Sequence, residues 1–183
     1  MCGVGDKAPR ANLCEEGHLA MDLEIVLPRR GVIATARLLD ADAPRTSAAV
    51  WEALPQGGEV FHAKYARNEL YTFVPPFAPA PIGLENPTVT PIPGDLVYFE
   101  FGAGMLPAST YGYADDEAAA GAESVIDLAV FYGRNNLLLN GDVGWVPGNV
   151  FGTVTEGLDE LAAAGNALWR EGTIGEELVF RRR

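Results

Sequence analysis

Two short segments that lie far apart in the chain constrain its fold most. The first, Ala34–Pro55, reads ATARLLDADAPRTSAAVWEALP and combines a strand pattern with a turn and a short helix. The second, Asn149–Leu161, reads NVFGTVTEGLDEL and again runs from a strand through a turn into a helix. Between them, most of the chain has the composition of strands and turns. The sequence therefore predicts a mainly β protein with two helices.

Apolar and polar side chains alternate along about eight segments, as they do in half-buried strands. Such strands follow one another through short turns, which favours an antiparallel sheet. Closing this sheet into a barrel would hide edges that otherwise expose unpaired backbone groups. We therefore expect a closed eight-stranded antiparallel barrel. Its strands are predicted at Asp22–Pro28, Val32–Leu39, Glu59–Tyr65, Glu69–Val74, Asp95–Phe101, Ser124–Gly133, Asn149–Val154 and Glu177–Arg181.

Two helices are expected to cap this barrel. Pro44 suits the first turn of a helix near residues 44–54, because its missing N–H costs nothing there. A second helix is expected from about Glu156 to Arg170, and Gly172 suits its end. This second helix has one apolar stripe, so we expect its large members to be buried. The stripe consists of Leu158, Leu161, Ala162, Leu168 and Trp169.

Three stretches do not show the pattern of core elements. Met1–Ala20 mixes glycine, proline and charge, so we expect a flexible, dispensable leader before one domain at residues 21–183. The proline-rich residues 74–94 should stay extended, because proline cannot join a central strand. Gly102–Glu123 is long for a loop, which favours a lid or a binding role.

Charge and apolar content limit the possible partners. The formal net charge of −12 would repel nucleic acid and anionic membranes at long range. The sequence has no apolar run near the ~20 residues of a membrane span, and no secretory signal pattern. The only cysteines, Cys2 and Cys14, lie in the leader, so a disulfide framework is not implied. We expect a cytoplasmic protein that binds neither nucleic acid nor membranes.

The two constraining segments resemble the opening and the closing elements of cyclophilins. Cyclophilins open with a strand, a turn containing Ala-Pro-x-Thr and a first helix, as Ala43-Pro44-Arg45-Thr46 does here. They close with a strand-turn-helix unit reading roughly V-F-G-x-V-x-x-G-x-D, which Val150–Asp159 matches. The resemblance implies an eight-stranded antiparallel barrel capped by two helices, and so supports the same cyclophilin-like fold class.

The chain departs from cyclophilins where those enzymes carry their catalytic arginine. Their third strand contains Phe-His-Arg, and this arginine binds the carbonyl before the substrate proline. Here the stretch reads Phe61-His62-Ala63-Lys64-Tyr65, so alanine takes the arginine position. Side chains alternate along a strand, which would turn Lys64 to the opposite face. Lysine also lacks the guanidinium fork that grips an amide in a fixed geometry.

Other cyclophilin landmarks are missing as well. The Phe-Met-x-Gln-Gly-Gly segment is absent, and no glutamine precedes Phe131-Tyr132. Gly148 or Asn149 replaces a histidine expected before the closing strand, whereas Trp145 resembles a tryptophan of the substrate cleft at a shifted spacing. The resemblance therefore implies little or no prolyl isomerase activity.

With these departures, the chain resembles a bacterial family of cyclophilin-like proteins of unknown function. Related proteins are found beside or within amide-cleaving enzymes. Such proteins carry His-Ala-Arg/Lys-aromatic followed by Glu, then Glu-Asn, then Gly-Asp-Leu. The resemblance covers residues from about Met21 to the C-terminus. The matching positions are His62-Ala63-Lys64-Tyr65 with Glu69, Glu85-Asn86 and Gly94-Asp95-Leu96.

The candidate ligand-binding residues are aromatic, charged or amide side chains. Most come from elements that could border one face of the barrel, where aromatic walls with a few charges suit a small ligand. His62 could equally be a structural histidine, and Glu85-Asn86 could simply bind loop backbone. The candidates are His62, Lys64, Tyr65, Glu69, Glu85, Asn86, Tyr98, Glu100, Tyr132 and Trp145.

Three functions fit this sequence. The first choice is a binding module for a peptide or a small amide-containing ligand, with little or no isomerase activity. The second is a prolyl isomerase that uses Lys64 as a displaced electrostatic clamp. The third is an accessory subunit of an amide-metabolising enzyme, or a homo-oligomer. We expect no cofactor, and only two histidines, one in the leader, argue against a metal site.

Overall fold

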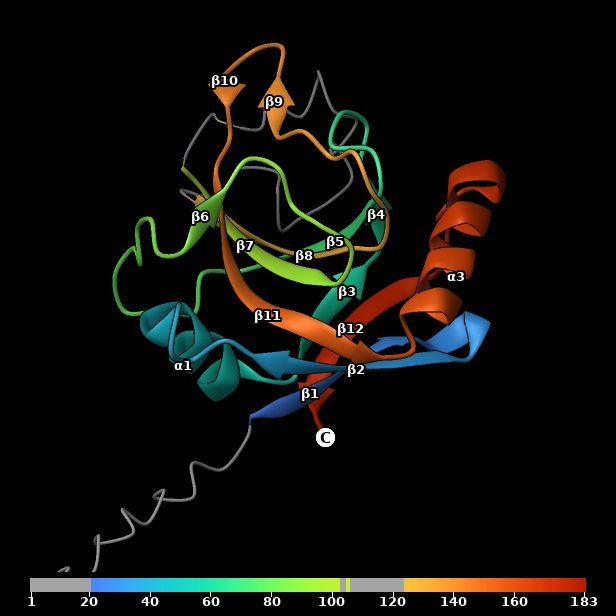
Figure 1. Ribbon diagram of the computed structural model, residues 1–183, viewed down its shortest axis with the longest axis horizontal. Helices are drawn as coiled ribbons and strands as arrows, with labels where there is room; N and C mark the ends of the chain where they lie inside the picture. Colours follow the sequence, from blue (N-terminus) through green and yellow to red (C-terminus); the bar gives the residue numbers. More distant parts are fainter. Residues whose placement is uncertain (1–20, 103–104, 106–123) are drawn as a thin grey trace, which may run out of the picture.

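A long antiparallel sheet dominates the computed structural model, which describes residues 21–102, 105 and 124–183 (Figure 1). The predicted leader and nearly all of the predicted loop Gly102–Glu123 lie outside these residues. The strands of the sheet are β1 (Asp22–Leu27), β2 (Val32–Leu38), β3 (Gln56–Glu59), β4 (Phe61–His62), β5 (Glu69–Val74), β6 (Pro87–Thr88), β7 (Asp95–Gly102), β8 (Ser124–Phe131), β11 (Gly148–Glu156) and β12 (Glu177–Arg182). The hairpin β9 (Leu139–Asn140) and β10 (Gly144–Trp145) is separate.

The sheet is a nearly closed barrel. Its strand order is β3-β12-β1-β2-β11-β7-β8-β5-β4, and the short strand β6 pairs with β11 outside this path. Only Val60 separates β3 from β4, so the path begins and ends on consecutive pieces of one interrupted strand. Taken as one strand, these two pieces leave the eight strands that the sequence predicts. The predicted mainly β, antiparallel barrel with two helices is confirmed.

The predicted strand Glu59–Tyr65 is shorter and broken in the structure. The backbone N–H of Val60 donates to the carbonyl of Glu176 at 3.1 Å, while β4 pairs with β5 on the other side. After His62 the chain turns away, and the N–H of Ala63 donates to the carbonyl of Glu69 at 3.1 Å. Arg67 lies at φ 76° in this turn. The backbone thus leaves the sheet just where the sequence pattern continues it.

Apolar side chains from alternating strand positions fill the barrel. Leu23, Ile25 and Leu27 of β1 are fully buried, as their spacing predicts. Phe151 of β11 and Phe180 of β12 are buried from the other side of the interior. We call this cluster the inner core. Because the inner core is one continuous cluster, the strands around it alternate between buried apolar side chains and side chains that face outward.

The helices lie at opposite sides of the barrel (Figure 1). Helix α1 (Pro44–Ala53) contacts β11, where the hydroxyl of Ser47 donates to the carbonyl of Phe151 at 3.2 Å. Helix α3 (Leu158–Glu171) contacts β2 and β4. It follows Gly157, whose φ of 81° and close approach to β2 both require glycine.

One prediction about α3 is wrong. Leu161 is fully buried as expected, but 65% of Trp169 is exposed. The buried stripe runs through Leu161, Ala164, Gly165 and Leu168, which follow the helical repeat. Trp169 lies one position, about 100°, beyond this stripe, because a helix turns once every 3.6 residues. It therefore projects from the side of the helix instead of into the core.

A second apolar layer covers the outer face of β5, β7 and β8. Aromatic side chains of these strands are covered by Leu138 and Val146, which flank the β9–β10 hairpin. We call this cluster the outer layer; its strand members include Tyr71, Phe73, Val97, Phe99, Phe101, Val125, Ala129 and Phe131. This part of the wall is therefore buried on both faces. No helix in the described part of the chain is long and apolar enough to cross a membrane.

Candidate functional site

Six of the ten candidate residues line two separate cavities. Tyr98 and Glu100 of β7 line the first, which we call the Glu100 cavity. His62, Lys64, Tyr65 and Tyr132 line the second, which we call the His62 cavity and which α3 borders. The two differ in the charges they carry and in how they are built.

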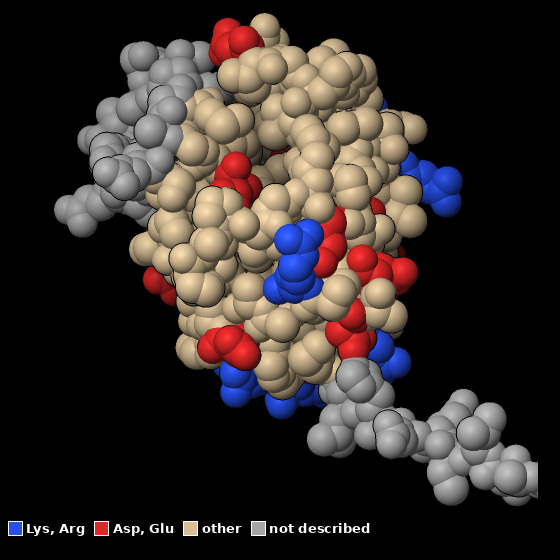
Figure 2. All heavy atoms as spheres, turned by 90° about the vertical axis from the view of Figure 1, so that its left-hand side faces the viewer, with Lys and Arg blue, Asp and Glu red and all other residues tan. Residues whose placement is uncertain are grey.

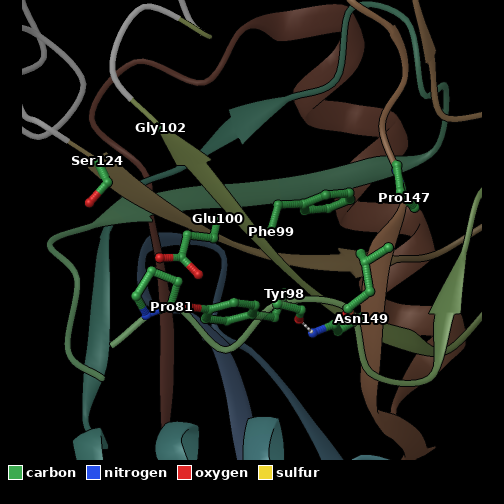
Figure 3. A pocket seen from close by; sticks show the side chains of 10 residues that line it. Pro81, Tyr98, Phe99, Glu100, Gly102, Ser124, Pro147 and Asn149 are labelled. Atoms are coloured by element: carbon green, nitrogen blue, oxygen red, sulfur yellow. Dashed lines mark hydrogen bonds between the residues drawn. The ribbon is translucent and has the colours of Figure 1, made fainter. Parts of the chain in front are cut away.

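The Glu100 cavity has a volume of about 390 Å³ and lies beside β7 and β11, next to the proline-rich segment. Figure 3 shows Glu100 beside Pro81 and Tyr98, with the ring of Phe99 extending toward Pro147. Its walls are thus mostly apolar, with few polar groups. The full lining is Pro81, Gly83, Leu84, Tyr98, Phe99, Glu100, Gly102, Ser124, Pro147 and Asn149.

The Glu100 carboxylate is held in place by its neighbours. Tyr98 donates a hydrogen bond to it, and the N–H of Ile82 donates to Oε2 at 3.3 Å. Burial and the charge of Glu100 both raise the pKa of Tyr98. The phenol therefore stays protonated and keeps donating, which orients the carboxylate toward one part of the cavity.

A hydrogen-bonded frame supports this cavity from behind. Asn149 of β11 donates through Nδ2 to the carbonyl of Gly83 at 2.8 Å, and its Oδ1 accepts from the N–H of Glu85 at 2.9 Å. The Glu85 carboxylate accepts from the N–H and the hydroxyl of Thr46 at 2.7 and 2.9 Å. These bonds tie the loop, α1 and β11 together. Asn86 is also structural, since its Nδ2 donates to the carbonyl of Val150 at 2.9 Å.

The frame also stabilises the charge of Glu85. Burial alone would raise its pKa, but hydrogen bonds from Thr46 and Arg45 outweigh burial and lower it. The Nε of Arg45 lies 3.0 Å from the carboxylate. Glu85 and Asn86 therefore bind loop backbone, α1 and β11, as the structural interpretation of these residues expects, and lie behind the cavity that Asn149 lines.

The His62 cavity has a volume of about 370 Å³ and lies between the end of β4, the end of β8 and α3. Lys64 and Arg67 are the charged members of its lining apart from the titratable His62, and the lining contains no carboxylate among the described residues. The full lining is His62, Ala63, Lys64, Tyr65, Arg67, Asn68, Tyr132, Asn166 and Trp169.

His62 and Tyr132 form the centre of this cavity. The Nε2 of His62 lies 2.5 Å from the hydroxyl of Tyr132, and its Nδ1 lies 3.2 Å from the carbonyl of Ala63. Burial lowers the pKa of His62 and raises the pKa of Tyr132 to about 12. A carbonyl only accepts, so Nδ1 of the neutral ring carries the proton and Nε2 accepts from Tyr132.

Close packing on α3 holds this pair in position. A Cβ at Gly165 would lie 2.6 Å from the ring of Tyr132, so only glycine lets the helix approach so closely. The ring of Trp169 lies 5.1 Å from the ring of His62, centre to centre. The sequence prediction missed Trp169 because it placed this side chain in the core. A glycine inside a helical pattern is the signal that could have indicated the close contact.

Glu69 lies in neither cavity. It is buried on the outer face of β5, and burial raises its pKa to about 8. Asp127 of β8 is buried as well; burial and the charge of Glu69 raise its pKa. Its Oδ1 has no hydrogen-bond partner in the described structure. Both groups are therefore held in the protonated form more readily than a surface carboxyl.

The remaining candidate, Trp145, lies on the β9–β10 hairpin, where 59% of it is exposed. It pairs with Leu139 across the hairpin and lines neither cavity. In the described ranges, no three His, Cys, Asp or Glu side chains come close enough together to hold a metal ion. On the face that Figure 2 shows, acidic side chains form separate patches with few cations among them.

Comparison with solved structures shows a fold shared with McbB. McbB, solved in complex with tryptophan, matches with a TM-score of 0.55 and 21% identity over 88% of this chain. The match covers 44% of McbB, so this chain corresponds to less than half of that protein. The hypothetical protein AF2241 from Archaeoglobus fulgidus matches with a TM-score of 0.49 and 19% identity, over 92% of this chain and 99% of AF2241.

Comparison by sequence assigns a family without a known activity. None of the curated proteins matches the chain. Residues 25–180 match the family described as protein of unknown function (DUF3830), which spans nearly all of the barrel and both helices. The chain therefore belongs to the DUF3830 family of proteins of unknown function.

Proposed function

We propose that the protein is a binding module whose Glu100 cavity takes a small amide-containing molecule or a peptide segment. The observation that carries this proposal is an oriented carboxylate inside a cavity of about 390 Å³ with aromatic and proline walls. Ligand sites typically combine such apolar walls with a few fixed polar groups.

The chemistry of an amide fits these groups. An amide N–H can donate to Glu100, and hydrogen bonds to a charged acceptor contribute roughly 1.5–3 kcal/mol. The planar, apolar faces of the amide can pack against Phe99 and the proline rings. The hydroxyl of Ser124 lines the same cavity and can donate to the amide carbonyl.

Catalysis of prolyl isomerisation is not expected from this arrangement. In cyclophilins, which the chain resembles, an arginine stabilises the twisted amide, and Ala63 takes its place here. Ala63 is buried in the outer layer, only 4% exposed. Removing a donor from a site of this kind commonly costs about 10²–10³ in rate. We expect proline-limited cleavage of a chromogenic tetrapeptide to show at most a trace of isomerase activity; robust turnover would promote the enzyme alternative.

Titration with a small amide tests the binding proposal. The probe is N-acetylglycinamide, followed through backbone amide shifts of the full chain; the methyl ester of N-acetylglycine, which lacks the terminal amide, is the matched ligand. Shifts should centre on Tyr98 and Glu100, and Glu100→Gln should weaken binding on the order of tenfold. Glu156→Gln, an exposed change on β11 outside the cavity, is the control. Equal binding to wild type and Glu100→Gln would contradict the proposal.

A role as accessory subunit of an amide-metabolising enzyme is the second candidate. The exposed apolar side chains of the β9–β10 region favour it, because Trp145, Leu139 and Val143 all lie open to solvent. Apolar groups gathered at the surface are typical of protein contacts. Trp145→Ser should then weaken association with such an enzyme and leave the titration with N-acetylglycinamide unchanged.

A further inference from the structure

We infer that the His62 cavity is a second ligand site, and that it selects a small aromatic carboxylate. This inference is independent of the Glu100 cavity. It stands on the residues that line the space of about 370 Å³ between β4, β8 and α3.

Charge is the first argument. The chain carries a formal net charge of −12, yet the described lining of this cavity contains Lys64 and Arg67 and no carboxylate. A local positive potential on an acidic protein raises the concentration of anions at that point. The guanidinium of Arg67 can bind a carboxylate through parallel hydrogen bonds, and Lys64 can add a further donor.

The aromatic wall is the second argument. Trp169 is 65% exposed although it is the largest side chain on α3, and its ring lies 5.1 Å from that of His62. Tyr65 lines the same cavity and is also exposed. A flat apolar ligand that covers the indole would remove this surface from water, which is favourable.

The polar centre is the third argument, because it is preorganised. Tyr132 donates to His62, and His62 donates to the carbonyl of Ala63, so both hydroxyl and imidazole hydrogens are already engaged. Asn68 is fixed in the same way, since its Nδ2 donates to the carbonyl of Arg134 at 2.7 Å. The guanidinium of Arg67 at the rim is therefore the main donor for an incoming anion, and the ring of the ligand meets the aromatic wall.

Three aromatic probes of similar size separate the role of charge from the role of the ring. The full chain is titrated with benzoate, benzamide and benzylamine, and the indole N–H signal of Trp169 and the backbone shifts around Tyr132 are followed. We expect benzoate to bind on the order of tenfold more tightly than benzamide, and benzylamine not to bind at this cavity. Acetate, which carries the charge without the ring, should bind more weakly than benzoate.

Variants identify the groups responsible. Arg67→Gln and Lys64→Gln should each weaken benzoate binding several-fold and leave benzamide binding unchanged. Arg170→Gln removes a cation that is next to Trp169 but does not line the cavity. It should therefore change neither benzoate binding nor benzamide binding. Trp169→Ala should weaken the binding of benzoate and leave the binding of acetate unchanged.

Several outcomes would overturn the inference. Equal binding of benzoate and benzamide would remove the role of charge, and equal binding of benzoate and acetate would remove the role of the ring. Shifts confined to Glu100 and Tyr98 would assign the probe to the other cavity. Because Arg67 and Lys64 are exposed, either variant that keeps the melting temperature of the wild type suffices for this test.

Discussion

The Glu100 and His62 cavities lie on one barrel but are built by different means. The Glu100 cavity is acidic, and hydrogen bonds among a loop, α1 and β11 hold its frame. The His62 cavity carries Lys64 and Arg67, and close packing of Tyr132 against Gly165 holds its centre. A hydrogen-bonded frame fails when one partner is removed, because the others remain buried and unpaired. A packed frame fails when a side chain becomes larger.

The outer layer links these two cavities. Phe99 belongs to this layer and lines the Glu100 cavity, while Ala63 belongs to it and lines the His62 cavity. The same wall holds the buried carboxyls of Glu69 and Asp127. A change in the protonation of Glu69 or Asp127 should therefore change the stability of the whole barrel more than it changes ligand binding in either cavity.

The largest expected effect is a pH dependence of stability that Glu69 causes. Burial raises its pKa from 4.5 to about 8, so between these values the folded state binds more protons than the unfolded state. The free energy of unfolding therefore falls as the pH rises through this window, and the contribution is fully present only below about pH 4.5. At about 1.4 kcal/mol for each pKa unit, the loss reaches up to roughly 5 kcal/mol.

Urea unfolding of wild type and Glu69→Gln between pH 5 and 8.5 measures this effect. The variant should be more stable than the wild type at pH 8.5, and the difference should shrink toward pH 5. Glu177→Gln, an exposed change on β12, is the control and should run parallel to the wild type. If the free energy of unfolding of Glu69→Gln followed that of the wild type in parallel across this pH range, Glu69 would be ionised at neutral pH in the folded protein.

The next effect tests the hydrogen-bonded frame. Glu85→Ala leaves the N–H and hydroxyl of Thr46 without their acceptor, and removes the partner of Arg45. Each buried donor left unpaired costs about 1–3 kcal/mol, so we expect a loss of about 2–4 kcal/mol in the free energy of unfolding. N-acetylglycinamide should no longer bind, whereas benzoate should bind as before.

The control for this change is Glu59→Ala, which removes an exposed carboxylate from β3 and should cost little. If Glu85→Ala abolished benzoate binding as well, the two cavities would not be separate units. The comparison between them would then fail.

A smaller effect tests the packed frame. Gly165→Ala adds a Cβ 2.6 Å from the ring of Tyr132, and overpacking costs about 1–3 kcal/mol, partly offset by the roughly 1 kcal/mol that alanine contributes inside a helix. We expect a net loss of about 1 kcal/mol and weaker benzoate binding, with amide binding unchanged. Gly141→Ala, where a Cβ meets nothing within 4 Å, is the matched control. Unchanged benzoate binding by Gly165→Ala would show that Tyr132 does not order the cavity.

The parts of the fold that depend on a local repeat could be predicted from sequence. Leu23, Ile25 and Leu27 alternate and fill the inner core, and Pro44 begins α1 as its fixed φ allows. The break between β3 and β4 could not be predicted, because it depends on partners that are remote in sequence: Val60 still bonds the carbonyl of Glu176, whereas β4 pairs with β5. Tertiary partners of this kind leave no local pattern.

Tertiary structure also explains why the predicted single site is divided between two cavities. Tyr98 and Tyr132 both alternate into the inner core, so sequence places them on one face. Their hydroxyls nevertheless reach different cavities, because β7 and β8 run antiparallel and their residues differ in height along the wall. Glu69 was expected among the ligand contacts, yet it faces the outer layer, whose covering segments are remote in sequence.

The smallest effect on stability, and the sharpest difference between stability and binding, is expected from Trp169→Ala. Exposed side chains usually contribute within about 0.5 kcal/mol, so the urea midpoint should move little despite the size of the indole. Leu161→Ala, two turns away in the buried stripe of the same helix, should cost about 2–5 kcal/mol. Benzoate binding should respond the other way, falling in Trp169→Ala and persisting in folded Leu161→Ala. A large stability loss in Trp169→Ala would place the indole in the core and close the cavity that it borders.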